Sequence, residues 1–341
     1  MSCFQLGELI LVSKPYAYVL NNDCRGQRCD YCFQRQSNLK RCSQCSFLYF
    51  CDKACQDLLI SLLHLNLLKY LEKYVLIHLV SVIMKCKVLG AEYILGMYRA
   101  SLFDHSCSPD AEVVFDGTNL HIHAVKHIPH RDISKIYISY IEQLQLTKDR
   151  QNALREQYYF LCQCKNCTSS EYNEMMTKLL VSEKEAEQHL GKFKTAFEHI
   201  KQMEKNKAGP SSIYSACVQE LLSQEKILAD THIYRVKILE YAFNACILNN
   251  QWTDAHAMGI QLLKPYRMFY GPYHPTLGIH LYKLAKIQRM LGISSWIVTL
   301  QEVETILQVT HGKTHPFYQC LMKILNDSGA LPCLSTLSIE E

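Results

Sequence analysis

The chain has 341 residues, the composition of an ordinary globular protein and a formal net charge of +4. This length predicts two or three domains that bury sizeable cores. The charge is mild and dispersed, which argues against direct nucleic-acid binding, and no uncharged stretch reaches the ~18 residues that a membrane span needs.

Cysteine usage indicates the compartment. Thirteen of the 17 cysteines precede Thr168, mostly in close pairs. The chain does not open with the charged, apolar and small-residue regions of a secretory signal. Closely paired thiols without such a signal favour metal binding in a reducing compartment over disulfides, so we expect an intracellular protein.

Residues 8–20 predict one or two short strands, because β-branched and aromatic residues dominate and Pro15 interrupts them. Three cysteine pairs follow at once, with two or three residues between the members of each pair. Such spacing directs both sulfurs of a pair at one ion, from a tight turn or from one face of a short helix. The six candidate zinc ligands are Cys29, Cys32, Cys42, Cys45, Cys51 and Cys55.

These pairs predict one closed zinc site and one incomplete site, because structural zinc is four-coordinate. The first and third pairs together close one site. The middle pair, Cys42 and Cys45, needs two more ligands. His64 is one candidate, although its leucine-rich surroundings suit a core histidine about as well. Cys24 is the other candidate ligand for the middle pair in this stretch.

The next segments alternate between helix and strand patterns. Residues 58–89 are dominated by leucine, isoleucine and valine, which predicts a buried or interface helix. Residues 111–115 and 120–125 flank the turn Asp116-Gly117 and predict a hairpin. A third strand is expected at 136–140, followed by a helix at 147–159.

The chain after Thr168 is expected to be entirely helical. The motif Gly-x-x-His-Pro occurs twice in it, ending at Pro275 and at Pro316. Glycine can end one helix in a left-handed cap, and proline suits the first turn of the next. This recurrence predicts stacked helical hairpins of the tetratricopeptide type.

A third metal-ligand cluster precedes the helical region. Cys162, Cys164 and Cys167 supply three sulfurs, and the isolated Cys107 is the obvious fourth ligand. Such a site would pin the loop around Cys107 against the segment that follows Tyr159.

In this order, the features resemble the SET and MYND domain (SMYD) protein lysine methyltransferases. The cysteines between Cys29 and Cys55 match a MYND pattern inserted into a split SET domain. Asp104-His-Ser-Cys107 resembles the family's Asn-His-Ser-Cys, and Tyr137-Ile-Ser-Tyr140-Ile follows it. The segment 156–167 matches the post-SET zinc segment, and His311-Gly-x-x-His315-Pro matches the helical C-terminal domain.

The resemblance implies an α+β chain: a split SET-domain β-fold with an inserted MYND zinc module, a post-SET zinc site and an all-helical, tetratricopeptide-like C-terminal domain. The implied boundaries are 1–23 for the first part of the SET domain, 24–57 for the MYND module, 58–95 for a shortened helical insert, 96–160 for the SET core, 161–170 for the post-SET segment and 171–341 for the helical domain.

Four departures from the family pattern are expected to weaken cofactor binding more than the fold. The interval between Cys55 and Asp104 is much shorter than in the family, and the last histidine and cysteine of the MYND module are missing or degraded. The chain begins after the family's glycine-rich cofactor loop, where only backbone without a Cβ approaches the ligand. Asp104 replaces an asparagine and so loses a hydrogen-bond donor. Residues 130–133 read His-Arg-Asp-Ile where the family has Gly-Glu-Glu-Leu.

The resemblance further implies methyl transfer from S-adenosylmethionine to a protein lysine, with two to three zinc ions. Tyr140 would orient the amine and the methyl group, Asp104 and His105 would hold the cofactor, and Tyr158 and Phe160 would line the cofactor pocket or the lysine channel. Taken singly, each of these residues suits a structural role equally well or better. Only their order along the motif favours an active site.

The implied partners are a protein substrate, with histones among the candidates, and proline-containing peptides at the MYND module. The implied location is the cytoplasm and the nucleus. The alternative function is a catalytically inactive adaptor, which uses its zinc module and helices to bind protein segments.

Overall fold

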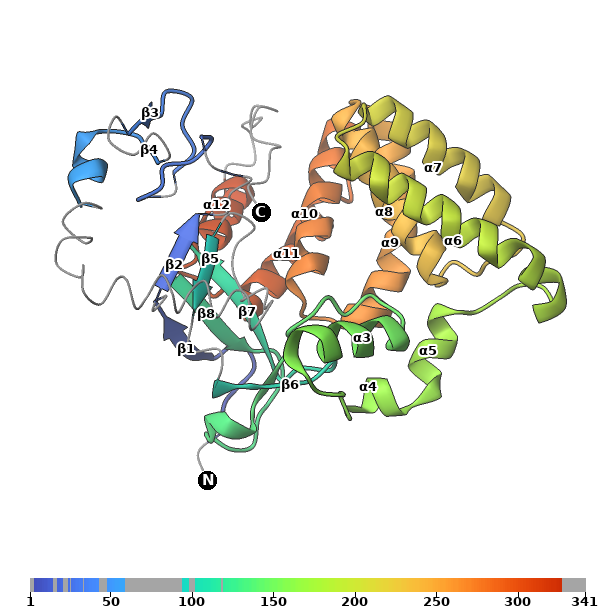
Figure 1. The fold of residues 1–341 in the computed structure, drawn as a ribbon, viewed down its shortest axis with the longest axis horizontal. Coiled ribbons are helices and arrows are strands. Elements are labelled where there is room, and N and C mark those ends of the chain that lie inside the picture. The colour runs from blue at the N-terminus through green and yellow to red at the C-terminus, as the bar shows by residue number, and fades with distance from the viewer. Residues whose placement is uncertain are drawn as a thin grey trace.

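The computed structural model describes residues 3–14, 17–20, 24, 26–32, 34–42, 48–58, 94–97, 102–117 and 119–326. Its N-terminal part is rich in strands and its C-terminal part is helical, and the two lie side by side (Figure 1). None of the helices in these ranges combines the length and apolar character of a membrane span. The helix expected at 58–89 lies outside the described residues, apart from its first position.

Nine short strands form the β-rich part within the residues that the structure describes. They are β1 (Leu9–Ser13), β2 (Ala17–Leu20), β3 (Lys40–Arg41), β4 (Tyr49–Phe50), β5 (Ile94–Met97), β6 (Asp104–His105), β7 (Ala111–Asp116), β8 (Asn119–Ala124) and β9 (Tyr137–Ile138). The largest sheet has the order β1-β8-β7, and β2 pairs with β5, β3 with β4, and β6 with β9. The two strands expected within residues 8–20 therefore form, in two different sheets.

The predicted hairpin is confirmed as β7 and β8, which pair antiparallel up to Asp116 and Asn119. Gly117 takes a φ of 57°, which a tight two-residue hairpin turn requires. The turn therefore starts one residue later than the sequence pattern suggested. One face of the sheet buries Ala111, Leu120 and Ile122 in a core with Phe103 and Ile138.

The strand expected at 136–140 is shorter than predicted. Only Tyr137 and Ile138 pair as β9, parallel to β6. The chain leaves the sheet before Tyr140, because the backbone N–H of Tyr140 donates to the side chain of His105 instead of to a neighbouring strand. Tyr140 therefore lies beyond the strand, where its ring packs at the edge of the same core.

The rest of the chain is helical, as expected. A 3-10 turn, η3 (Ile133–Lys135), precedes β9. The helices are α3 (Thr147–Tyr158), α4 (Lys165–Thr168), α5 (Ser170–Met176), α6 (Glu183–Lys205), α7 (Pro210–Gln224), α8 (Ile233–Leu248), α9 (Trp252–Tyr270), α10 (Pro275–Met290), α11 (Trp296–Thr310) and α12 (Pro316–Asn326). Helices α6 to α12 pack on one another in sequence as helical hairpins (Figure 1).

Histidine caps mark the start of alternate helices in this stack. The Nδ1 atoms of His232, His274 and His315 accept the backbone N–H two residues ahead, at 3.3, 3.1 and 3.1 Å. Gly271 and Gly312 both take a φ of 77° just before these caps, as the sequence motif predicted. The structure adds a third copy at α8, which lacks the glycine and the proline.

The two complete copies of the motif both face strand β7. Because the Nδ1 atom of His315 accepts, its Nε2 atom donates to the main-chain oxygen of Phe115, at 2.9 Å. His274 points its Nε2 at the carboxyl group of Glu112, 3.9 Å away. The helical part is thus fixed to the sheet by the same residues that cap its own helices.

Candidate functional site

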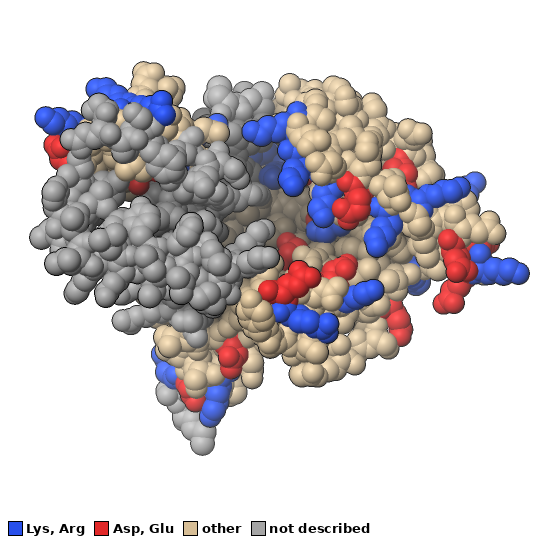
Figure 2. All heavy atoms as spheres, in the orientation of Figure 1, with Lys and Arg blue, Asp and Glu red and all other residues tan. Residues whose placement is uncertain are grey.

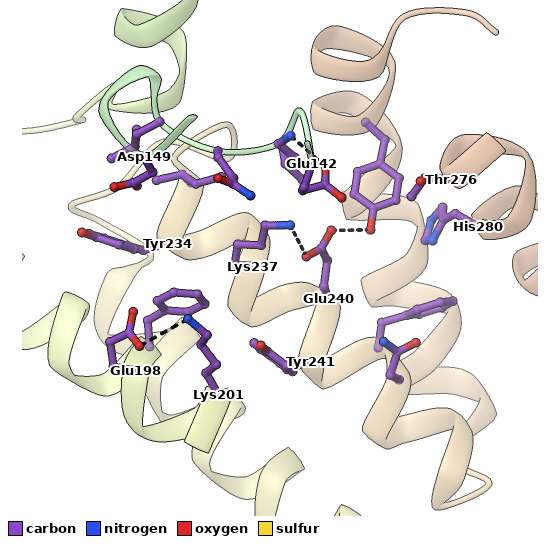
Figure 3. A pocket seen from close by; sticks show the side chains of 18 of the residues that line it. Glu142, Asp149, Glu198, Lys201, Tyr234, Lys237, Glu240, Tyr241, Thr276 and His280 are labelled. Atoms are coloured by element: carbon purple, nitrogen blue, oxygen red, sulfur yellow. Dashed lines mark hydrogen bonds and ion pairs between the residues drawn. The ribbon is translucent and has the colours of Figure 1, made fainter. Parts of the chain in front are cut away.

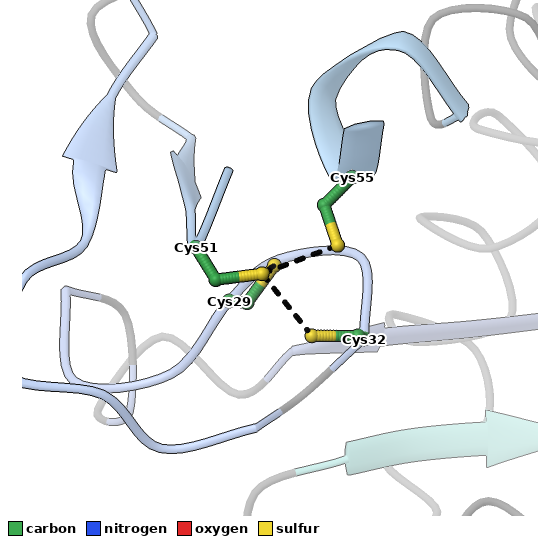
Figure 4. A group of neighbouring side chains, drawn as sticks. All are labelled: Cys29, Cys32, Cys51 and Cys55. Carbon is green, nitrogen blue, oxygen red and sulfur yellow. Dashed lines mark hydrogen bonds between the residues drawn. The ribbon is translucent and has the colours of Figure 1, made fainter. Parts of the chain in front are cut away.

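The first cysteine cluster brings together the first and third pairs (Figure 4). Ligand atoms of Cys29, Cys32, Cys51 and Cys55 all lie within 4.8 Å of one another. The Sγ atom of Cys51 is 3.7 Å from that of Cys32, 3.8 Å from that of Cys29 and 3.2 Å from that of Cys55. Sulfurs at the about 2.3 Å Zn–S distance of a tetrahedral site lie roughly 3.8 Å apart, so this cluster fits zinc.

Local hydrogen bonds set the position of these sulfurs. Asp30, between the first two cysteines, exchanges bonds with Tyr49 on β4: its backbone N–H donates to the Tyr49 oxygen at 2.7 Å, and its carboxylate accepts from the Tyr49 N–H at 2.8 Å. Asp52 caps the helical turn at 53–58 by accepting from the Cys55 N–H at 2.8 Å. Burial raises the pKa of Cys51 to about 11, so a cation is needed to make this thiol a thiolate.

The middle pair of cysteines is only partly described. Cys42 is buried beside the first cluster, and the Gln56 side-chain amide lies 3.6 Å from its sulfur. Cys45 and His64 lie outside the described residues. Cys24 belongs to neither of the metal-competent groups that the described residues form. The incomplete second site of the module therefore stays a prediction.

The second cluster consists of Cys107, Cys162, Cys164 and Cys167, whose ligand atoms also lie within 4.8 Å of one another. The sulfurs of Cys107 and Cys167 are 3.5 Å apart, close to the spacing around a tetrahedral zinc. Cys107 thus joins the three later cysteines, and the geometry again fits zinc. The loop around Cys107 is held against the segment after Tyr159.

Arg150, which the sequence analysis did not single out, lies against this cluster. Its side chain is fully buried, with Nη2 3.7 Å from the Cys167 sulfur and 3.0 Å from the Asn166 oxygen. Four thiolates around one zinc ion carry a net charge of −2, so a buried guanidinium beside them is electrostatically favourable. The same guanidinium lies over the Tyr172 ring, 4.9 Å from its centroid.

A cavity of about 420 Å³ opens next to the second cluster. Its volume falls within the range of small-molecule sites. All five residues that the sequence singled out for the active site line it, together with three residues of the segment after α3. The lining residues are Asp104, His105, Tyr140, Tyr158, Phe160, Leu161, Cys162 and Gln163.

The positions of Tyr140 and His105 are fixed by each other and by the loop. The Tyr140 hydroxyl donates to the main-chain oxygen of Phe103. The His105 Nδ1 accepts the Tyr140 N–H at 3.0 Å, which leaves the ring proton on Nε2, 3.3 Å from the Cys107 sulfur. Burial raises the pKa of Tyr140 and lowers that of His105 to about 4, so both side chains are neutral at pH 7.

Aromatic rings form the wall of the cavity. The Tyr140 centroid lies 4.9 Å from that of Tyr158, 5.2 Å from that of His105 and 6.4 Å from that of Phe160. The backbone between Tyr158 and Phe160 makes this possible, because Tyr159 takes a left-handed φ of 61° at the end of α3. Tyr158 and Phe160 both face the cavity, whereas Tyr159 is 73% exposed.

A larger cavity, of about 910 Å³, lies between α3 and the inner faces of α6, α8 and α10. Figure 2 shows a hollow in this face of the molecule, with positive and negative side chains around it. In Figure 3, Lys237 pairs with Glu240 at 3.0 Å and Lys201 with Glu198 at 3.5 Å. Glu142, two residues after Tyr140, is one of the residues that line it. This groove could not be predicted from the sequence, because its walls come from distant helices.

Comparisons with known proteins show what the chain is similar to. Residues 29–64 match the MYND finger model. The chain is 24% identical to N-lysine methyltransferase SMYD2-A of Danio rerio and 25% identical to histone-lysine N-methyltransferase SMYD3 of Mus musculus, over 95% of this chain and 94% and 93% of the two relatives. The chain is thus similar, along nearly its whole length, to the SET and MYND domain (SMYD) lysine methyltransferases.

The similarity to the SMYD proteins bears on two other features, the length of the chain and its architecture. The alignment with the zebrafish relative runs over 412 residues, more than the 341 of this chain, so that relative has segments without a counterpart here. The α+β architecture, with a split SET fold, a MYND module and a tetratricopeptide-like helical region, matches the expectation. A solved Podosopora anserina kinesin light chain with TPR-like repeats matches 40% of this chain and 65% of its own at 19% identity and a TM-score of 0.32, which is too low to bear on the fold.

Proposed function

We propose that this chain is a protein-lysine N-methyltransferase that uses S-adenosylmethionine. The observation that carries the proposal is the cavity beside the second cysteine cluster. Five residues from three separate segments of the family motif line it together, although 56 positions along the chain separate the first, Asp104, from the last, Phe160. The kinship with SMYD2 and SMYD3 supports the same activity.

Tyr140 is the residue that we propose to orient the reacting amine. Its hydroxyl proton is already donated to Phe103, so the phenol oxygen presents its remaining lone pair as an acceptor. Burial raises the pKa of Tyr140, which keeps the phenol neutral and unsuited to act as a base. Its proposed contribution is therefore alignment of the lysine amine, which is the main requirement of an in-line displacement.

The other lining residues suit a positively charged ligand. S-adenosylmethionine would supply an electrophilic methyl group on a sulfonium ion. The rings of Tyr140, Tyr158 and Phe160 present π faces that attract a cation. The carboxylate of Asp104, at the exposed edge of the cavity, adds a negative charge where the family has a neutral amide. We propose that the attraction of this charge for the sulfonium ion partly compensates for the lost hydrogen-bond donor of the amide.

We propose that the large groove holds the segment of the protein substrate that flanks the target lysine. Glu142, close along the chain to Tyr140, lines the groove, and the walls offer both charges and the rings of Phe197, Tyr234 and Tyr241. This mixture suits an extended peptide with apolar and charged side chains.

Histones, and proline-containing peptides at the MYND module, remain proposed partners. The cytoplasm and the nucleus are the proposed location.

The decisive experiment is calorimetric titration of S-adenosylmethionine into zinc-loaded protein, followed by methylation of histone and peptide substrates. We expect micromolar binding. Tyr140→Phe should keep that affinity within a fewfold and lower turnover about a hundredfold, because the ring stays and the oriented oxygen is lost. Tyr137→Phe is the matched control, since its ring is exposed on β9.

An inactive adaptor is the second candidate function, and the large groove is the observation that favours it. Absence of heat with S-adenosylmethionine in folded, zinc-loaded protein would reject methyl transfer. Peptide binding that is weakened by Tyr234→Ala under the same conditions would then support the adaptor.

A further inference from the structure

A second cavity, of about 420 Å³, lies where three parts of the chain meet. The loop Cys107–Pro109 and strand β7 form one side. Asn166 and Tyr172 form another, and the turn between α9 and α10 closes it. The cavity shares the second cysteine cluster with the proposed cofactor pocket: Cys107 lines one cavity and Cys162 lines the other. It is otherwise a separate space, with no residue in common.

The polar group on its wall is the carboxyl group of Glu112. This residue is only 9% exposed, and its cross-strand neighbour on β8 is His123. Gln143 donates a hydrogen bond to it, and the neutral Nε2–H of His274 lies 3.9 Å away, beyond hydrogen-bond length. Burial, opposed by Gln143 and assisted by the negative charge of Glu142, raises the pKa of Glu112 to about 8. A carboxyl group in such a setting lacks a full positive charge beside it.

The remaining wall is aromatic. Tyr172 and Phe269 meet edge to face with centroids 5.5 Å apart, and Tyr270 and Tyr273 continue the surface. Lys126, the cation at this cavity, is already paired with Asp110 at 2.7 Å. Aromatic faces around a buried carboxyl group are the surroundings that bind organic cations in proteins.

We propose that this cavity is a second ligand site, which binds an ammonium or guanidinium group carried on an apolar body, with Glu112 as its counter-ion. The cation can come from a lysine or arginine side chain of a protein or from a free amine. Below pH 8 Glu112 holds a proton, and binding of the cation releases this proton to solvent. The proposal does not depend on methyl transfer. An occupant would contact the loop whose other end carries Asp104 and His105.

The test uses 2-phenylethylammonium and its neutral analogue 2-phenylethanol, titrated by calorimetry into the zinc-loaded full chain at pH 7 in two buffers of different ionisation enthalpy. We expect the ammonium to bind about tenfold more tightly than the alcohol and to release close to one proton. Glu112→Gln should abolish both the preference and the proton release. Asp116→Asn, on the same strand but outside the cavity, should change neither.

A second variant keeps the test informative if Glu112→Gln affects folding. Tyr273→Ala shortens the aromatic wall without touching the carboxyl group, and should weaken both probes equally. A blocked peptide, acetyl-Gly-Lys-Phe-Gly-amide, then distinguishes the sources: displacement of the probe by the peptide assigns the site to protein side chains, and displacement by free amines alone assigns it to small amines. Equal affinity for ammonium and alcohol, or no binding of either at millimolar concentration in folded protein, would overturn the proposal.

Discussion

The guanidinium of Arg150 lies 3.7 Å from the sulfur of Cys167 and is completely buried. It also donates to Gln145, Thr147 and Asn166 and covers the ring of Tyr172. Tyr172 in turn donates from its hydroxyl to the Phe269 oxygen on α9 at 3.2 Å. One side chain therefore connects the second cysteine cluster to α3, to the post-SET segment and to the helical region.

Replacement of Arg150 by methionine should destabilise this junction. The apolar side chain leaves the thiolates of the cluster and three acceptors without their buried donor, and we expect the free energy of unfolding to fall by about 3 kcal/mol. Zinc release, followed with a coloured chelator, should become faster. Arg155→Met, at an exposed position of the same helix, is the control, and equal release from both variants would contradict the role of Arg150.

Zinc content tests the two clusters separately. We expect at least two zinc ions per chain by metal analysis. Cys51→Ser and Cys164→Ser should each remove one ion, because a closed tetrahedral site tolerates no loss of a thiolate. Cys320→Ser, at an exposed cysteine on α12, should remove none. A value near one ion in the unmodified chain would eliminate one of the two sites.

Protease resistance near Tyr158 is a further readout of the second cluster. Cys164→Ser should loosen the segment after α3, and cleavage there should accelerate. Unchanged resistance would count against ligation by Cys164.

The contact between Gly312 and His123 can be isolated with a pair of alanine variants. A Cβ on Gly312 would lie 3.0 Å from the Cε1 atom of His123, whereas one on Gly271 would meet nothing within 4 Å. Both glycines have a φ of 77°, which a residue with a Cβ rarely adopts, so alanine is strained at both positions. In urea unfolding, Gly312→Ala should cost about 1 kcal/mol more than Gly271→Ala. Equal costs would show that the His123 ring moves aside without a loss of stability.

The interface between the sheet and the helices should be sensitive to acid. Burial lowers the pKa of His274 to about 4 and that of His311 to about 3. The unfolded chain takes up these protons near pH 6.5 and the folded chain does not, so stability falls as the pH drops below 6.5. Glu112 acts in the opposite direction, because its raised pKa makes folding take up a proton between about pH 8 and its ordinary value of 4.5.

His274→Asn should flatten this acid slope. Asparagine can still cap α10 but does not titrate, so the loss of stability between pH 6.5 and 5.5 should be smaller by about 1 kcal/mol. His199→Asn, at an exposed histidine on α6, should leave the slope unchanged. Both variants keep all the cysteines, so release of zinc by acid is common to them and does not account for a difference between their slopes.

The sequence predicted the parts of the molecule that depend on local spacing. The cysteine pairs, the hairpin at Gly117 and the glycine and proline signals around α10 and α12 all follow from short-range geometry. Arg150 could not be predicted in the same way, because nothing in its own segment distinguishes a buried arginine from an exposed one. His232 was missed because isoleucine follows it where the other two caps have proline.

The candidate site was predictable through the order of its motif and not through any single residue. Tyr140 was expected at the end of a strand, yet it lies beyond β9, since its N–H is taken by His105. The large groove was invisible in the sequence, because its lining residues from α3, α6, α8 and α10 are neighbours only after the helices have stacked.

His274 and His315 both point at residues of strand β7, and α11 packs against β7 and β8. The two histidines can hold their positions only when their own helices are formed, and the sheet loses these contacts when the helices melt. Sheet and helical stack should therefore denature in a single cooperative transition, and a fragment lacking α11 and α12 would leave the oxygen of Phe115 facing water. Loss of the last helices would then be felt at Asp104 and His105 on β6, because β7 packs against β9, the strand that pairs with β6.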